Sequence, residues 1–156
     1  MVTVGLWLRW AGLSNGYTSD EVALVLPHSF WTMLTQGESA VNPPWFPALF
    51  NTLFDTHEVV LWARRWSMFM AACTLVTITF FGRAYGRGSL WAGVVAASLF
   101  AFHPWAIDHA SVFRVYSTTT AVAAWHLLVV GHLLRNGASR IWQIQLITTA
   151  VLLPQL

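Results

Sequence analysis

Charged residues in this chain are sorted by sign around its long apolar runs. Two of the stretches between these runs hold all six acids, which are Asp20, Glu21, Glu38, Asp55, Glu58 and Asp108. Two other turns contain no acid and hold only basic residues, which are Arg83, Arg87, Arg135 and Arg140. Basic residues are retained on the cytoplasmic side of membrane proteins. The pattern therefore predicts a polytopic membrane protein, with the arginine turns inside and the acid-bearing loops outside.

Composition agrees with this prediction. Charged residues make up 9% of the chain and hydrophobic residues 56%, whereas ordinary globular domains are roughly 25% charged. The ten Trp are typical of residues placed at membrane interfaces. The net charge of +2 is spread over several loops, without a basic stripe, which excludes a nucleic-acid partner. The single cysteine, Cys73, excludes an internal disulfide.

The apolar runs cover residues 1–8, 66–81, 89–102, 115–134 and 141–156. A bilayer core requires roughly 20 helical residues, so the 89–102 run must extend into residues 103–107 or end beneath the outer interface. The first and last runs are short, and we expect them to be truncated helices. The predicted fold is all-α, a single membrane domain over residues 1–156 with about four transmembrane helices.

Small residues on the 89–102 run predict close helix packing. Gly93 and Ala97 are four residues apart, as are Ala92 and Ala96. Residues at this spacing share one helix face, where another helix can approach closely.

A long outer loop, residues 14–62, carries two amphipathic patterns. The first follows Asp20 and consists of Val22, Leu26, Phe30 and Met33. The second follows Pro43-Pro44 and consists of Trp45, Phe46, Leu49, Phe50 and Leu53. Both patterns have helical spacing, so the loop is predicted to contain two helices lying in the membrane interface.

Two positions in the loops and helix starts could carry chemistry. The Asp20-Glu21 pair could act as a general base or hold a divalent metal, although acids at a helix start also serve as caps. Arg114 enters an otherwise apolar helix and could hold a phosphate or a carboxylate. Its alternative is to extend to the outer headgroups.

The histidines give weaker signals. His103, Asp108 and His109 cluster at a turn, where their spacing matches no metal signature and favours a hydrated loop. His126 lies in the middle of an apolar run. There a helix–helix hydrogen bond is favoured over ligation of a pigment or haem.

Several short motifs in a fixed order carry a family resemblance. They are Leu6–Leu13, Tyr17–Glu21, Gly37, Asn42-Pro43-Pro44, Ala63–Arg65, Gly82–Gly86, His103-Pro104 and Phe113–Tyr116. Together they resemble the N-terminal part of C-type, polyprenyl-phosphate-sugar-dependent glycosyltransferases. The resemblance is greatest to the protein mannosyltransferase and aminoarabinose transferase branch.

The resemblance implies a site on the outer face. Asp20 and Glu21 occupy the place of the family's catalytic acidic pair, which in some members also binds a metal. Arg65, Arg114 and Tyr116 match residues expected to hold the phosphate of the donor lipid. The family's His-Pro-Pro-like element is Asn42-Pro43-Pro44 here, a departure in its first residue. The implied reaction is inverting sugar transfer to an acceptor, with the carboxylate as base and the arginines stabilising the departing phosphate.

Size limits this reading, because about four crossings cannot enclose a lipid-linked sugar and shield it from water. Two hypotheses follow. The chain is either part of a longer transferase or a catalytically inactive relative that serves as a structural subunit of a membrane complex. In both cases we expect an integral protein of a bacterial inner membrane, with acidic loops on the periplasmic side and membrane lipids and other membrane subunits as partners.

Overall fold

The structure is a computed structural model, and it describes residues 4, 7, 45–55, 58–85, 89–110, 115–137 and 139–153. Its helices are α4 (Trp45–Leu53), α5 (Val59–Tyr85), α6 (Leu90–Ala101), α7 (Pro104–Ala110), α8 (Tyr116–Asn136) and α9 (Arg140–Leu152). Val4 and Trp7 are helical as well, and no strand occurs among the residues described. The predicted all-α class is confirmed for this part of the chain.

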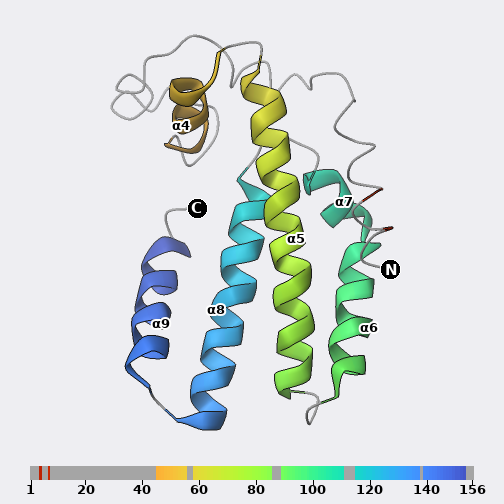
Figure 1. The fold of residues 1–156 in the computed structure, drawn as a ribbon, viewed down its shortest axis with the longest axis vertical. Helices are drawn as coiled ribbons and strands as arrows, with labels where there is room; N and C mark the ends of the chain where they lie inside the picture. Colours follow the sequence, from red (N-terminus) through yellow and green to blue (C-terminus); the bar gives the residue numbers. More distant parts are fainter. Residues whose placement is uncertain are drawn as a thin grey trace.

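The helices form a bundle around α5, which packs against α6 and α8, while α9 packs against α8 (Figure 1). The aromatic end is where α5 and α8 begin, beside α7, and it carries Trp62, Trp66, Trp105, His109 and Tyr116. The arginine end is where α5 and α8 end and α9 begins, and it carries Arg83, Arg135 and Arg140. The two ends of the bundle therefore differ in the side chains that they carry.

Two helices are long and apolar enough to cross a membrane. At 1.5 Å per residue, the 27 residues of α5 span about 40 Å and the 21 residues of α8 about 32 Å. A third crossing results only if α6 and α7, which are bent by 68°, form one span. Because α9 has only 13 residues, the count of about four crossings stays a prediction.

The bend between α6 and α7 follows from local sequence. Ser89 caps α6 by accepting a hydrogen bond from the Trp91 amide at 3.3 Å. The residue before a proline disfavours the helical conformation, so α6 ends at Ala101, ahead of His103-Pro104. Proline is well placed at the first position of a new helix, and α7 begins there. Residues 103–107 therefore extend the 89–102 run only through a bend, and whether α6 and α7 form one crossing stays a prediction.

The α5–α6 contact depends on glycine. A Cβ atom on Gly82 would collide with the backbone of Gly93, and one on Gly93 would collide with the backbone of Thr79. Ala97 is buried beside them in a small apolar core with Leu75 and Ala101. The predicted packing face of Gly93 and Ala97 is thus confirmed. The Ala92 and Ala96 pair does not form a second one, because Ala92 is exposed and Ala96 only half-buried.

The α8–α9 pair confirms the prediction for His126. Its Nδ1 lies 2.7 Å from the Thr149 hydroxyl on α9. When that hydroxyl donates to the Gln145 carbonyl, 2.9 Å away, its oxygen can accept a hydrogen bond from a protonated Nδ1. The tight turn between the two helices uses Gly137, whose φ of 80° is easily adopted only by glycine.

Two boundaries differ from the sequence predictions. α5 begins at Val59 rather than at residue 66, so the predicted loop over residues 14–62 ends earlier and Arg64-Arg65 lie within the helix. The second loop pattern does form a helix, α4. The first pattern, Val22 to Met33, lies outside the described residues. The placement of both loop patterns at a membrane interface stays a prediction.

Candidate functional site

Trp66 connects three helices at the aromatic end. Its indole N–H donates to the Thr118 hydroxyl on α8 at 3.0 Å. Its ring meets the buried Phe50 of α4 edge-on, with 6.4 Å between centroids. Phe54, which directly follows α4, stacks on Trp62 with 5.1 Å between ring centroids. Large rings bury much area and have specific contact geometry, so this cluster fixes where α4 lies against the start of α5.

The two adjacent arginines of α5 have different environments. Arg64 is only 4% exposed and is engaged by neighbouring groups. Arg65 is exposed, and its guanidinium lies 4.7 Å from the centre of the Trp62 ring, within cation–π range. Arg65 was a predicted site residue, whereas Arg64 was not.

A signal for Arg64 was present in the sequence. Arg64, Ser67, Ala71 and Thr74 are all buried on α5 and are separated by three, four and three residues. This spacing defines one helical face. A charge on a face that is otherwise small and polar indicates an interior position, whereas Arg65 lies on the neighbouring, lipid- or solvent-facing side.

Tyr116 belongs to a second aromatic group, with Trp105 and His109 of α7. The His109 ring stacks on Trp105, with 4.2 Å between centroids, and lies 4.8 Å from the Tyr116 ring. His109 Nδ1 is 3.0 Å from the Trp105 carbonyl. Because a carbonyl only accepts, Nδ1 carries the hydrogen and Nε2 is the nitrogen left for other partners.

The predicted hydrated turn at His103, Asp108 and His109 is therefore more ordered than expected. His103 and Asp108 are exposed, but His109 is half-buried in helix α7. The Asp108 carboxylate lies 3.7 Å from His109 Nδ1. Among the residues described, no group of three or more His, Cys, Asp or Glu is arranged to hold a metal.

A small cavity lies behind this aromatic group. It has a volume of about 10 Å³ and is lined in part by Thr74, His109, Ser117 and Thr120. The three hydroxyls donate to the carbonyls of Met70, His109 and Tyr116 at 2.9, 3.0 and 2.7 Å, so only their lone pairs are left. The space suits about one water molecule and is far too small for a sugar.

The structure places two of the five predicted site residues, Arg65 and Tyr116. Both lie at the aromatic end, but among described residues no contact joins them, since Arg65 packs on Trp62 and Tyr116 on His109. Asp20, Glu21 and Arg114 lie outside the described residues. Their predicted approach to the arginines, and a divalent metal at Asp20/Glu21, stay predictions.

Comparison of the chain with protein-family models, with curated proteins and with solved structures finds no match in any of the three.

Proposed function

We propose that the chain is an integral membrane protein of a bacterial inner membrane in which α5 and α8 cross the bilayer. Asp55 and Glu58 directly precede α5 and Asp108 lies on α7, so these acids are at the aromatic end, and the arginine end carries none among the residues described. By the retention of basic residues on the cytoplasmic side, the aromatic end faces outward. α4 then lies in the outer interface.

Topology can be tested with thiol labelling. Cys73 is the native cysteine, so a Cys73→Ser background receives one new cysteine at Gly88, Asn136 or Ser39. In intact cells, a membrane-impermeant maleimide should label Ser39→Cys and leave Gly88→Cys and Asn136→Cys unlabelled until the cells are opened. Labelling at Gly88 or Asn136, with protection at Ser39, would reverse the assignment.

For the activity, we propose sugar transfer from a polyprenyl-phosphate donor at the aromatic end. The observation that supports this most directly is the burial of Arg64 beside Arg65 at the start of α5. A buried cation in an apolar helix is costly to maintain and by default marks a functional position. In this proposal Asp20 or Glu21 is the base, Arg65, Arg114 and Tyr116 bind the lipid phosphate, and Arg64 positions them.

A second candidate function has a specific observation in its favour. The cavity at the aromatic end holds about 10 Å³, and α6 leaves an open apolar groove of about 700 Å³ along Trp91, Val95 and Leu99. Group transfer needs a water-shielded chamber, which the described residues do not form by themselves. A structural subunit, whose apolar faces pack against other membrane proteins, accounts for both features.

Transfer assays separate the two functions. The full chain in nanodiscs would receive polyprenyl-phosphate-mannose or polyprenyl-phosphate-aminoarabinose carrying a labelled sugar, with membrane extract as acceptor. A transferase should release labelled product, and Asp20→Asn should lower the rate by about a thousandfold because the general base is lost. Asp108→Asn, which removes the same charge from an exposed acid outside the proposed site, is the matched control and should leave the rate unchanged.

The structural alternative predicts no transfer by the wild type with either donor. It also predicts that the chain is recovered from native membranes in a stoichiometric complex. The amount of labelled product should be at background level both for the wild type and for Asp20→Asn. Transfer by the wild type that survives Asp20→Asn would contradict the catalytic assignment of this acid.

A further inference from the structure

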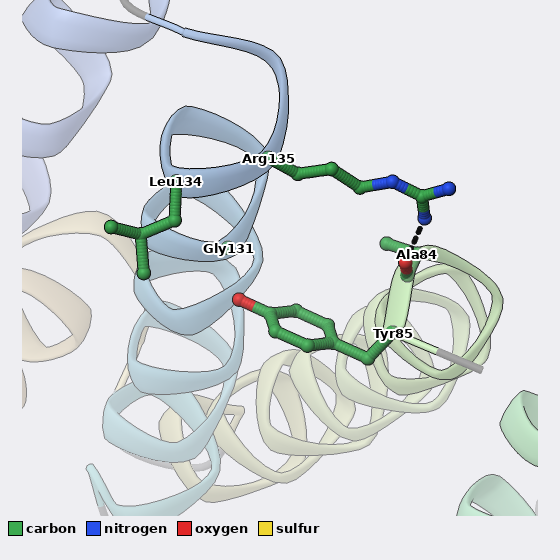
Figure 2. A pocket seen from close by; sticks show the side chains of 5 residues that line it. All are labelled: Ala84, Tyr85, Gly131, Leu134 and Arg135. Carbon is green, nitrogen blue, oxygen red and sulfur yellow. Dashed lines mark hydrogen bonds between the residues drawn. The ribbon is translucent and has the colours of Figure 1, made fainter. Parts of the chain in front are cut away.

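A pocket with two polar side chains in its lining lies at the arginine end, between the last turns of α5 and α8. It has a volume of about 310 Å³ and is lined by Ala84, Tyr85, Gly131, Leu134 and Arg135. Figure 2 shows Arg135 extending from α8 toward α5 and Tyr85 extending from α5 toward α8, with the pocket between them. Each helix thus supplies one polar side chain to the same space.

One hydrogen bond holds the Arg135 guanidinium in place and leaves its other N–H donors available. Its Nη1 donates to the Ala84 carbonyl (Figure 2). A guanidinium has five N–H donors in a planar fork, so the others can still reach a ligand. This geometry suits the oxygens of a phosphate, which Arg binds in a bidentate manner.

Tyr85 supplies a second donor, in a fixed orientation. Its ring stacks on Phe81, with 4.3 Å between centroids, and its other edge lies against Gly131. A Cβ atom on Gly131 would collide with the Tyr85 hydroxyl and ring, so glycine at this position leaves room for the phenol. Within the described part of the chain, the hydroxyl has no hydrogen-bond partner.

The surrounding charge favours an anion. Arg83 and Arg140 lie at the same end as Arg135, and the described residues there include no acid. Carbonyls at the C-termini of α5 and α8 oppose an anion. The bond from Arg135 to Ala84 neutralises part of this effect at the pocket itself.

We propose that this pocket binds the phosphate of an anionic membrane phospholipid. Two long apolar helices end at its level, and Leu134 on its rim is 81% exposed, where an acyl chain can pack. Basic pockets between membrane helices on the cytoplasmic side are known to suit anionic headgroups. The site lies at the opposite end of the bundle from the proposed transferase site and does not depend on it.

The test measures lipid retention on the full-length protein. The purified chain is equilibrated in detergent with equimolar phosphatidylglycerol and phosphatidylcholine, and bound lipid is counted by native mass spectrometry. Both lipids carry a phosphate, but the choline cation makes phosphatidylcholine neutral overall, whereas phosphatidylglycerol keeps a net negative charge beside the Arg135 guanidinium. We therefore expect phosphatidylglycerol to be retained over phosphatidylcholine by about tenfold. Arg135→Gln should abolish this preference, and Tyr85→Phe should reduce it by about threefold.

Two matched controls isolate the pocket from general electrostatics. Arg83→Gln and Arg140→Gln remove the same charge at the same end but outside the pocket lining, and should change the preference by less than about twofold. Gly131→Ala keeps every charge but displaces Tyr85, and should lower retention as far as Tyr85→Phe does. Helicity and tryptophan fluorescence establish that each variant is folded.

Three outcomes would overturn the proposal. They are equal losses for Arg83→Gln, Arg140→Gln and Arg135→Gln, no preference for phosphatidylglycerol in the wild type, and unchanged retention in Gly131→Ala. A final arm adds inorganic phosphate at millimolar concentration. Failure to displace phosphatidylglycerol supports a lipid ligand, whereas displacement with high affinity would identify a soluble phosphate compound and contradict the lipid assignment.

Discussion

At the aromatic end the helices are joined by large side chains, whereas at the arginine end their backbones approach one another. Trp66 reaches from α5 to Thr118 on α8 and to Phe50 on α4. At the other end, Gly82 and Gly93 bring α5 and α6 into backbone contact. Side-chain contacts can be rearranged by rotamer changes, but backbone contacts cannot. We expect the arginine end to hold the bundle together while the aromatic end adapts to a bound substrate or partner.

The largest expected effect comes from the buried arginine of the aromatic end. Arg64→Leu removes a charge that is 4% exposed and engaged by its neighbours. The groups that interact with Arg64 then lose their partner, which should lower the free energy of unfolding by about 2–4 kcal/mol. Arg65→Leu is the adjacent control. It loses only an exposed cation–π contact, for which we expect about 0.5–1 kcal/mol. Unfolding in mixed detergent micelles, followed by tryptophan fluorescence, compares the two; equal losses would show that burial does not distinguish them.

Next in size is the backbone contact near the arginine end. Gly93→Ala places a Cβ against the Thr79 backbone and should cost about 1–3 kcal/mol through overpacking. Ala92→Val adds more volume one residue earlier, on an exposed face, and should change stability by less than about 0.5 kcal/mol. If thermal unfolding shows Gly93→Ala to be as stable as the wild type, the backbone contact does not hold this end.

The ring cluster should tolerate change better. Trp66→Phe keeps an aromatic ring but loses the bond to Thr118, a loss of about 1 kcal/mol. Thr118→Val removes the same bond from the other side, so the double variant should cost little more than either single one. A double-mutant cycle measures this coupling, and purely additive losses would mean that the bond contributes nothing.

The smallest expected effect belongs to a contact between the two ends. The His126–Thr149 bond joins α8 and α9 at 2.7 Å, and interhelical hydrogen bonds in membranes contribute about 0.6 kcal/mol on average. Thr149→Val should therefore lower the free energy of unfolding by about this amount. Thr148→Val is the matched control, because the exposed Thr148 hydroxyl bonds within its own helix. A loss above about 2 kcal/mol would show that His126 has a larger role, because this exceeds the usual range for such a bond.

Helix positions could be predicted from sequence where an apolar run is long and ends in charge, glycine or proline. α8 begins and ends within two residues of its predicted limits, residues 115 and 134, because Arg135 and Gly137 mark its end. The 68° bend after α6 was harder, since apolar residues resume at Trp105 after His103-Pro104 and a hydropathy pattern carries no direction. The proline itself was the available signal.

For the candidate site, residue type was predictable but orientation was not. Arg64 and Arg65 have the same chemistry and differ by about 100° around the helix, which decides whether each is buried or exposed. Only the spacing of Arg64 to Ser67 and Thr74 separates them. The Tyr85–Gly131 contact joins two helices, and a single sequence without their packing does not pair these residues.

The shortness of α6 has a consequence for the bilayer itself. Its 12 residues span about 18 Å, well below the roughly 30 Å of a hydrocarbon core, and α7 turns away by 68° at its end. If the bundle spans a membrane, lipids beside α6 must shorten or tilt to keep their headgroups wet, a hydrophobic mismatch that thins one leaflet locally. This thinning would lie next to Trp105 and Tyr116, so a lipid-linked phosphate diffusing in the leaflet at the aromatic end would sit deeper there than elsewhere around the protein. Electron microscopy in nanodiscs would reveal the thinning as a dip in the headgroup density beside α6, and a flat bilayer there would rule it out.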